Sequence, residues 1–223
     1  MSLMNGIPTS SRVTVLPQDN HLLALMTILR DSKTDCIKFA DVVERVSTLV
    51  MAAALNLLPV EASDVTTPTG ATFQGALATK EVCGVSILRA GASMENALRR
   101  TYTGPLSYGK ILIQRDESTC LPAHLYSKFP KNVTRKAVFI LEPMLATGGS
   151  ACMAIDIIKA AGVPEEQIYF INLVASRKGL DTLGSRFPEV RIVTAAVDEE
   201  LTASNHITPG LGDFGDRFYG TVD

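Results

Sequence analysis

The chain has 223 residues, 46% of them hydrophobic, with 21 Lys and Arg against 23 Asp and Glu. This length suits one domain with a sizeable core. The net charge of −2 lacks the basic excess of a general nucleic-acid binder. Apolar runs fall well short of the roughly 20 residues of a membrane span, and no signal-peptide pattern opens the chain. We therefore expect a cytoplasmic protein without a nucleic-acid or membrane partner.

Cysteine and histidine are few and scattered. The four cysteines show no Cys-x-x-Cys spacing, and the three histidines form no cluster. This usage indicates reduced thiols rather than a disulfide framework or a zinc site. A metal held directly by the protein is therefore not expected.

The first 80 residues contain two predicted helices and a predicted hairpin. We expect an irregular segment at 1–18 and a single domain at 19–223. Apolar residues at helical spacing predict a helix capped by Asn20 and a longer one from about 35 to 57. A turn at 68–70 between β-branched residues predicts a hairpin.

Strands and helices alternate from residue 82 onward. We expect strands at 82–88, 110–114, 136–141, 168–175 and 190–197, and helices at 93–102, 151–161 and 178–187. This alternation predicts an α/β fold with a mostly parallel sheet flanked by helices. Ligands of such sheets bind at the carboxyl ends of the strands. Four charged residues follow those ends, namely Arg89, Arg115, Glu142 and Asp198.

A polar segment at 116–135, with two prolines, interrupts the alternation. Long loops inside a compact domain are usually functional or mobile. The segment could be a β-arm that closes over a ligand or reaches another subunit, or a surface hairpin without a role.

A loop of small residues after Glu142 is typical of phosphate binding. Gly148 and Gly149 allow the backbone to approach a phosphate without a Cβ clash. The start of the following helix favours an anion. Neither of the usual nucleotide fingerprints is present, which indicates a sugar phosphate rather than ATP or NAD. An ordinary structural turn between a strand and a helix is the alternative.

The C-terminal stretch 207–220 is rich in glycine and also aromatic. Such a composition resists helix and strand, yet Phe214, Phe218 and Tyr219 indicate that it packs. The stretch could be a packed tail, or a backbone cage whose N–H and C=O groups read the edges of a flat heterocycle.

Four motifs, in the same order along the chain, resemble those of the uracil phosphoribosyltransferases. They are Ile87-Leu-Arg-Ala-Gly91, the run Arg115, Asp116, Glu117, the loop Glu142-Pro-Met-Leu-Ala-Thr-Gly-Gly-Ser150, and the stretch from Ile207 to Gly220. The similarity extends from about residue 16 to the end. It implies the type I phosphoribosyltransferase fold, with a protruding β-arm at about 116–135 and a C-terminal base-binding hood at about 198–220.

The resemblance implies a glycosyltransferase of pyrimidine salvage. It would convert uracil and 5-phospho-α-D-ribose 1-diphosphate (PRPP) to UMP and diphosphate, with Mg²⁺ carried by PRPP. A homo-oligomer, dimer or tetramer, and a GTP effector are also implied. Two alternatives remain, a phosphoribosyltransferase for another base and a nucleotide-sensing RNA-binding regulator on the same fold.

Site residues follow from the positions that match the motifs. The resemblance implies that PRPP contacts Arg89, Ala90, Gly91, Arg115, Glu142, Pro143, Met144, Leu145, Ala146, Thr147, Gly148, Gly149, Ser150 and Asp213. It implies that uracil contacts Ile207, Gly212, Asp213 and Phe214. Glu142, Asp213 and Arg115 would be catalytic, and Asp213 could activate the base or hold a Mg²⁺-bound water. Two positions depart from the family pattern, since Asp is usual at 142 and Ala is common at 214.

Overall fold

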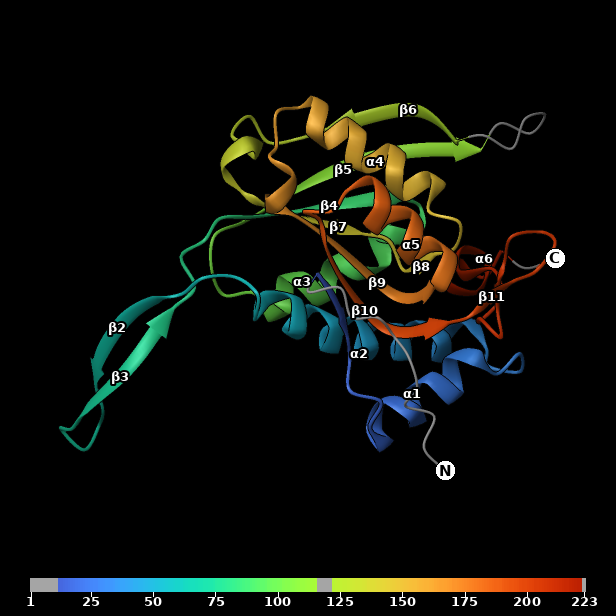
Figure 1. Cartoon of the computed structure of the whole chain (residues 1–223). Helices are drawn as coiled ribbons and strands as arrows, with labels where there is room; N and C mark the ends of the chain where they lie inside the picture. The colour runs from blue at the N-terminus through green and yellow to red at the C-terminus, as the bar shows by residue number, and fades with distance from the viewer. Residues whose placement is uncertain (1–11, 116–121, 222–223) are drawn as a thin grey trace.

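A mostly parallel sheet forms the centre of the chain (Figure 1). The computed structural model describes residues 12–115 and 122–221. The strand order is β1-β10-β9-β7-β4-β5-β6, with β8 beside β9, and only β6 runs antiparallel to its neighbour. The strands are β1 (Val13–Val15), β4 (Val82–Leu88), β5 (Leu106–Arg115), β6 (Pro122–Lys128), β7 (Ala137–Leu141), β8 (Met144–Leu145), β9 (Ile168–Ser176) and β10 (Arg191–Asp198). The predicted mostly parallel sheet is confirmed.

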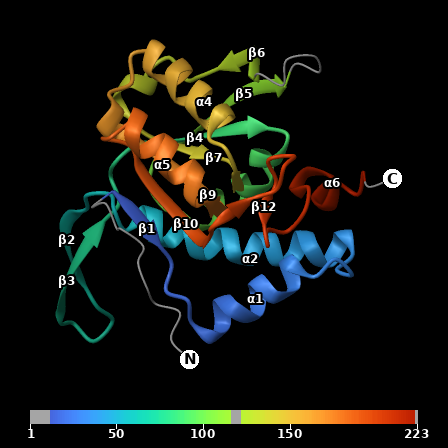
Figure 2. The ribbon, with the colours of Figure 1, turned by 45° about the vertical axis from the view of Figure 1, so that its right-hand side comes forward.

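Helices cover both faces of this sheet (Figures 1 and 2). One face carries α1 (Asn20–Arg30), α2 (Cys36–Leu55) and α3 (Glu95–Thr101), and the other carries α4 (Gly149–Ala160) and α5 (Arg177–Arg186). Every residue of β7 and β9 is buried, because each lies between two helical layers. The apolar runs that predicted these strands therefore reflect burial on both faces.

The N-terminal segment corrects two sequence predictions. Residues 13–15, expected to be irregular, form β1, which pairs with β10 through Val13 and Ile192. A three-residue strand leaves little local signal, and its partner is far along the chain. The first helix is capped by Asp19, not Asn20, because the Asp19 carboxylate accepts a hydrogen bond from the Leu22 N–H.

Two antiparallel hairpins bear on the sequence predictions, one separate from the central sheet and one at its edge. The predicted hairpin around 68–70 is confirmed as β2 (Glu61–Thr66) and β3 (Thr72–Leu77), which extends away from the body in Figure 1. In the predicted arm, β6 pairs with β5, and residues 116–121 lie outside the described residues. Closure of this arm over a ligand stays a prediction.

The C-terminal segment is more regular than its composition predicted. It contains β11 (Glu200–Leu201), β12 (Ile207–Thr208) and the short helix α6 (Phe214–Tyr219). Asp213 caps this helix by accepting a hydrogen bond of 3.0 Å from the Asp216 N–H, and Gly220 ends it with a φ of 67°. The expectation that 207–220 resists helix is therefore wrong for residues 214–219.

The described residues contain no disulfide and no membrane span. Cys36, Cys83 and Cys152 are free thiols, and Cys120 lies outside the described ranges. Among residues 12–115 and 122–221, no helix has the length and hydrophobicity that crossing a bilayer requires.

Candidate active site

A cavity of about 430 Å³ opens at the carboxyl ends of β4 and β7. Chain connections leave this pair of strands in opposite directions, since β4 leads to β5 on one side and β7 to β9 on the other. Such a switch point is where open α/β sheets bind ligands. The lining residues come from five separate segments, which are 87–90, Ile113, Glu142 with 144–151, 204–207, and 212–215.

The loop between β7 and α4 forms one wall of the cavity. Gly148 has a φ of 88°, which L side chains rarely adopt, and α4 begins directly after it. The Ser176 hydroxyl donates a hydrogen bond of 2.5 Å to the Ala146 carbonyl from below. Gly179 packs so closely that a Cβ there would lie 2.6 Å from the Ala146 oxygen. The loop is therefore held at its base, with the start of a 12-residue helix beside the cavity.

Arg89 follows β4 and lies at the mouth of the cavity. Its side chain is 60% exposed, and its Nη2 lies 3.5 Å from Asp216 Oδ1. The Tyr219 hydroxyl donates a hydrogen bond of 3.0 Å to the Arg89 carbonyl, and the Tyr219 ring centre lies 5.5 Å from the Arg89 guanidinium carbon. The peptide bond between Leu88 and Arg89 is cis. An exposed guanidinium is therefore available at this end of the cavity.

Gly91 lies beneath the cavity wall rather than on it. It is buried in the 3₁₀ helix η1 (Ala90–Met94) and does not line the cavity, although Ala90 does. A Cβ at Gly91 would lie 2.0 Å from the Leu141 carbonyl oxygen. Gly91 thus lets η1 touch the end of β7, directly before Glu142.

Two acidic residues line the cavity, Glu142 after β7 and Asp213 before α6. The Glu142 backbone is fixed, since its N–H donates a hydrogen bond of 3.2 Å to the Ile171 carbonyl. Within the described part of the chain, no three His, Cys, Asp or Glu side chains form a group that could hold a metal ion. The two carboxylates fit a hydrated Mg²⁺ that arrives bound to a diphosphate better than a cage built by the protein.

Phe214 contributes differently from a ligand-stacking aromatic. Phe214 is among the residues that line the cavity, but its side chain is buried. Its ring centre lies 5.5 Å from that of Phe39 in an edge-on contact and 5.7 Å from that of Phe218 in a stacked contact. The ring therefore anchors the hood to α2. Any contact with a ligand at this position would come from the backbone, where the difference between Ala and Phe matters little.

The structure brings most of the predicted site residues together. Arg89, Ala90, Glu142, 144–150, Ile207 and 212–214 all line the cavity, whereas Gly91 and Pro143 do not. Arg115 ends β5, and its side chain lies outside the described part. Asp198 does not line the cavity and instead pairs with Arg30.

Several lining residues carried no sequence signal. Ser204, Asn205 and His206 reach the cavity from the turn between β11 and β12, and Ile113 reaches it from β5. Asn205 has a φ of 63°, a backbone conformation that Asn tolerates better than most residues. The turn could have been found from this Asn among small polar residues, but its place on the same cavity as the loop at 146–150 could not.

Comparison with known proteins gives a consistent result. The family model described as uracil phosphoribosyltransferase matches residues 15–221. The uracil phosphoribosyltransferase of Saccharomyces cerevisiae is 47% identical over 207 residues, which cover 93% of this chain and 95% of that protein. Uracil phosphoribosyltransferase 1 of Schizosaccharomyces pombe is 45% identical, over 98% of this chain and 99% of that protein.

A solved structure supports the fold independently. The AQ2163 protein of Aquifex aeolicus superimposes with a TM-score of 0.82 at 29% identity, covering 93% of this chain and 97% of that one. The match of the family model spans nearly all the described residues, including every segment that lines the cavity. The chain belongs to the uracil phosphoribosyltransferase family.

Proposed function

We propose that this chain transfers the phosphoribosyl group of PRPP to uracil, giving UMP and diphosphate in pyrimidine salvage. One observation carries the proposal. A glycine-containing loop at 146–150, the hood residues Ile207 and 212–214, and the acidic residues Glu142 and Asp213 all line one cavity. A reaction between a sugar phosphate and a flat base needs both walls at once.

The loop at 146–150 would bind the 5-phosphate. Backbone N–H groups at the start of α4 and the partial positive charge of that helix favour a dianion. Because the loop is fixed from below by Ser176 and Gly179, binding energy at the phosphate can position the distant anomeric carbon.

Arg89 and Arg115 would bind the diphosphate that leaves. In the free enzyme Arg89 lies 3.5 Å from the Asp216 carboxylate, and both side chains are exposed, so a diphosphate can compete for the guanidinium. Mg²⁺ carried by PRPP would neutralise part of the remaining negative charge. The Arg115 contribution is proposed from its motif alone.

Glu142 and Asp213 would act on the ribose and the base. As the bond between the anomeric carbon and the leaving diphosphate lengthens, positive charge develops on the sugar, and a carboxylate at Glu142 stabilises it. One oxygen of Asp213 already accepts the Asp216 N–H. Among the described residues the other oxygen has no hydrogen bond, so it is free to orient the uracil nitrogen or a water bound to Mg²⁺.

Uracil presents two carbonyls and two N–H groups in one plane. The backbone at Ile207 and 212–214 can match these with N–H donors and C=O acceptors. Burial of the Phe214 ring beneath this backbone makes it a firm surface rather than a flexible loop.

The test is a panel of bases with PRPP and Mg²⁺, read out as diphosphate release and nucleotide product. UMP formation with uracil is expected, with far slower turnover of hypoxanthine, guanine and cytosine. Diphosphate release with a purine but not with uracil would support the alternative phosphoribosyltransferase.

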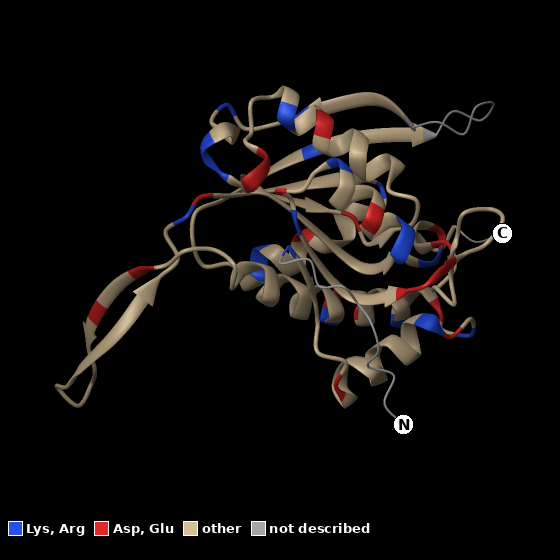
Figure 3. Cartoon of the chain, viewed as in Figure 1, with Lys and Arg blue, Asp and Glu red and all other residues tan. Residues whose placement is uncertain are grey.

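The RNA-binding alternative makes a different prediction. The full sequence has a net charge of −2, and Figure 3 shows Lys and Arg spread over several parts of the described chain with Asp and Glu among them, whereas RNA binding needs an excess of basic side chains. Filter binding with RNA at two salt concentrations is expected to show no salt-dependent retention.

We further propose a homo-oligomer in which the β2–β3 hairpin contacts a second copy. Val65 and Phe73 lie opposite each other on this hairpin and are 51% and 60% exposed. A two-stranded hairpin with exposed apolar residues is marginally stable in water. Sedimentation equilibrium should give a dimer or tetramer, and Phe73→Asp should shift it toward the monomer.

GTP activation and a cytoplasmic location stay predictions from the resemblance and from the sequence. Initial rates with and without GTP at subsaturating PRPP test the first. Cell fractionation tests the second.

A further inference from the structure

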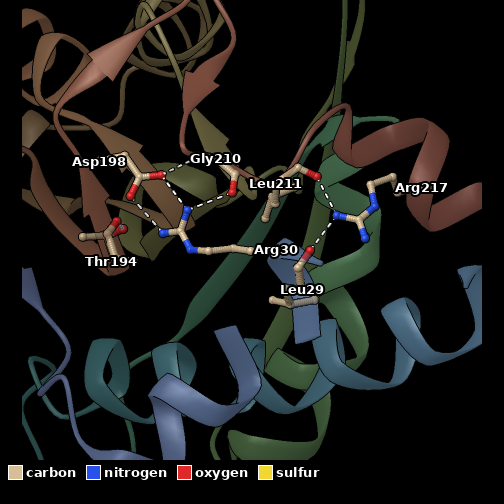
Figure 4. Close-up of polar contacts among 8 residues, drawn as sticks. Leu29, Arg30, Thr194, Asp198, Gly210, Leu211 and Arg217 are labelled. Atoms are coloured by element: carbon tan, nitrogen blue, oxygen red, sulfur yellow. Dashed lines mark hydrogen bonds and ion pairs between the residues drawn. The ribbon is translucent and has the colours of Figure 1, made fainter. Parts of the chain in front are cut away.

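The loop between β12 and α6 carries Gly212 and Asp213, two of the four residues proposed to bind uracil, yet it has no regular structure of its own. Two arginines hold it against the end of α1 (Figure 4). Arg30 is the last residue of α1, and Arg217 lies on α6. Neither arginine lines the cavity at the sheet edge.

Arg30 fixes the peptide groups around Gly210. Its Nη1 and Nη2 donate hydrogen bonds of 2.7 and 2.9 Å to the two oxygens of Asp198, which is only 6% exposed. The same Nη1 donates a bond of 2.8 Å to the Gly210 carbonyl, while the Gly210 N–H donates one of 2.9 Å to Asp198 Oδ2. Both polar groups of Gly210 are thus tied to one buried ion pair.

Arg217 fixes the next peptide group. Its Nη1 donates hydrogen bonds of 2.6 Å to the Leu211 carbonyl and 2.5 Å to the Leu29 carbonyl, and its Nη2 donates one of 2.6 Å to the Asp31 carbonyl. The guanidinium carbon lies 4.4 Å from the ring centre of Phe39. The cation thus joins the carboxyl end of α1, where a positive charge is favourable, to the hood.

These contacts determine which way the hood presents its N–H groups. In a trans peptide the C=O and the following N–H point in opposite directions. Because Arg217 holds the Leu211 carbonyl toward α1, the Gly212 N–H points away from α1. Gly212 lines the cavity and is exposed, and among the described residues its N–H donates no hydrogen bond. A donor is therefore kept ready for a ligand.

We infer that Arg30 and Arg217 are positioning residues that set affinity and selectivity for the base without touching it. The inference rests on the proposed function, because it takes uracil as the ligand of the hood. The two arginines bind adjacent peptide groups, so each one also restricts the orientation of the peptide group that the other one binds. The loop at 146–150, proposed to bind phosphate, belongs to a different segment of the cavity lining and does not depend on either arginine.

The experiment compares Arg217→Met and Arg30→Met with the wild type in steady-state kinetics for both substrates. We expect the KM for uracil to rise at least tenfold in each variant and the KM for PRPP to rise by a clearly smaller factor, because, among the described residues, only Asp213 and the contacts of α6 with Arg89 connect the hood to the PRPP side. The ratio of kcat/KM for uracil over cytosine should fall several-fold, because a relaxed backbone distinguishes a carbonyl from an amino group less well. Arg217→Lys keeps the positive charge but loses the planar guanidinium that donates several hydrogen bonds at once. Its KM for uracil should therefore lie between those of the wild type and Arg217→Met.

The matched control is Lys136→Met. Lys136 is 8% exposed and pairs with Glu81 at 2.6 Å, before the amino ends of β7 and β4 and therefore at the edge of the sheet opposite the site. Its loss should lower the melting temperature while leaving both KM values unchanged. Calorimetric titration with PRPP and Mg²⁺ should show unchanged PRPP affinity in Lys136→Met and, in the arginine variants, a smaller loss of PRPP affinity than the rise in the KM for uracil.

Coupling between the two arginines gives a second readout. The double variant Arg30→Met with Arg217→Met should raise the KM for uracil less than the product of the single effects, because both act on one loop. Suppose that the wild-type protein forms UMP, but the variants change the KM values for uracil and PRPP by the same factor or change neither value. The positioning role is then overturned, and the proposed function stands. If wild-type protein forms no UMP, both proposals fail. Should Arg217→Met not fold, Arg217→Lys carries the same comparison.

Discussion

Replacing Gly91 with alanine tests whether the close contact between η1 and the end of β7 is needed for the site. The added Cβ would lie 2.0 Å from the Leu141 carbonyl oxygen, whereas ordinary carbon–oxygen contacts are about 3.3 to 3.6 Å. The neighbour is backbone, so no side chain can swing away. Either η1 or the end of β7 must move by more than about 1 Å.

Two effects of this displacement can be estimated. Overpacking of this kind costs about 1–3 kcal/mol of folding free energy, and more where the backbone resists. Glu142 follows Leu141 directly, and misplacement of a catalytic group by about 1 Å can cost on the order of a hundredfold in rate. That loss corresponds to about 2.7 kcal/mol in activation free energy. We therefore expect Gly91→Ala to lose both stability and kcat/KM for PRPP.

Urea denaturation and steady-state kinetics measure the two effects separately. Gly184→Ala is the matched control, because Gly184 lies inside α5 and a Cβ there would meet nothing within 4 Å. That control should gain about 0.5–1 kcal/mol from helix propensity and keep its activity. Wild-type stability and kcat/KM in Gly91→Ala would refute the claim that this glycine is required for the contact between η1 and β7.

Three other substitutions test the walls of the cavity. In Gly148→Val the valine would have to adopt a φ of 88°, and its Cβ would lie 3.1 Å from Thr182. This strain costs about 1–2 kcal/mol, so the KM for PRPP should rise about tenfold or more. An unchanged KM for PRPP would argue against the assignment of a phosphate-binding loop. Glu142→Ala should lower kcat at least about a hundredfold, and retained turnover would remove Glu142 from the catalytic residues. Tyr219→Phe removes the hydrogen bond to the Arg89 carbonyl, worth about 0.5–1.5 kcal/mol, so the KM for PRPP should rise about two- to tenfold. Because burial raises the pKa of the Tyr219 phenol, the hydroxyl stays protonated and this effect should be the same at pH 7 and pH 9.

The sequence predicted best those elements whose cause is local. The strand at 82–88 has the predicted bounds because its apolar run is buried on both faces. The helix after Asp35 begins where predicted because the Asp35 carboxylate accepts a hydrogen bond from the Lys38 N–H. The loop at 146–150 was predicted from its glycines and from the helix that follows it.

Elements that depend on distant partners were missed or only partly predicted. Strand β1 exists because it pairs with β10, and helix α6 is held to the body because Phe214 packs on Phe39 of α2. Both of these partners lie far from the element in the sequence, whereas the Asp213 cap and Gly220 that bound α6 are local. Arg30 is a further example, since its partner Asp198 is 168 positions away. From the sequence alone, an arginine at the end of a helix is expected to be solvated. Only the fold shows that it pairs with the buried carboxylate of Asp198.

The two halves of the site are held by different physical means. The wall proposed to bind PRPP stands on the sheet, where close backbone contacts such as that of Gly91 with Leu141 fix the geometry. The wall proposed to bind uracil includes an irregular loop, whose carbonyl groups accept hydrogen bonds from Arg30 and Arg217. Substitutions in the first wall should therefore change stability and turnover together. Substitutions in the second should change recognition of the base first, because a loop can relax while the sheet remains folded.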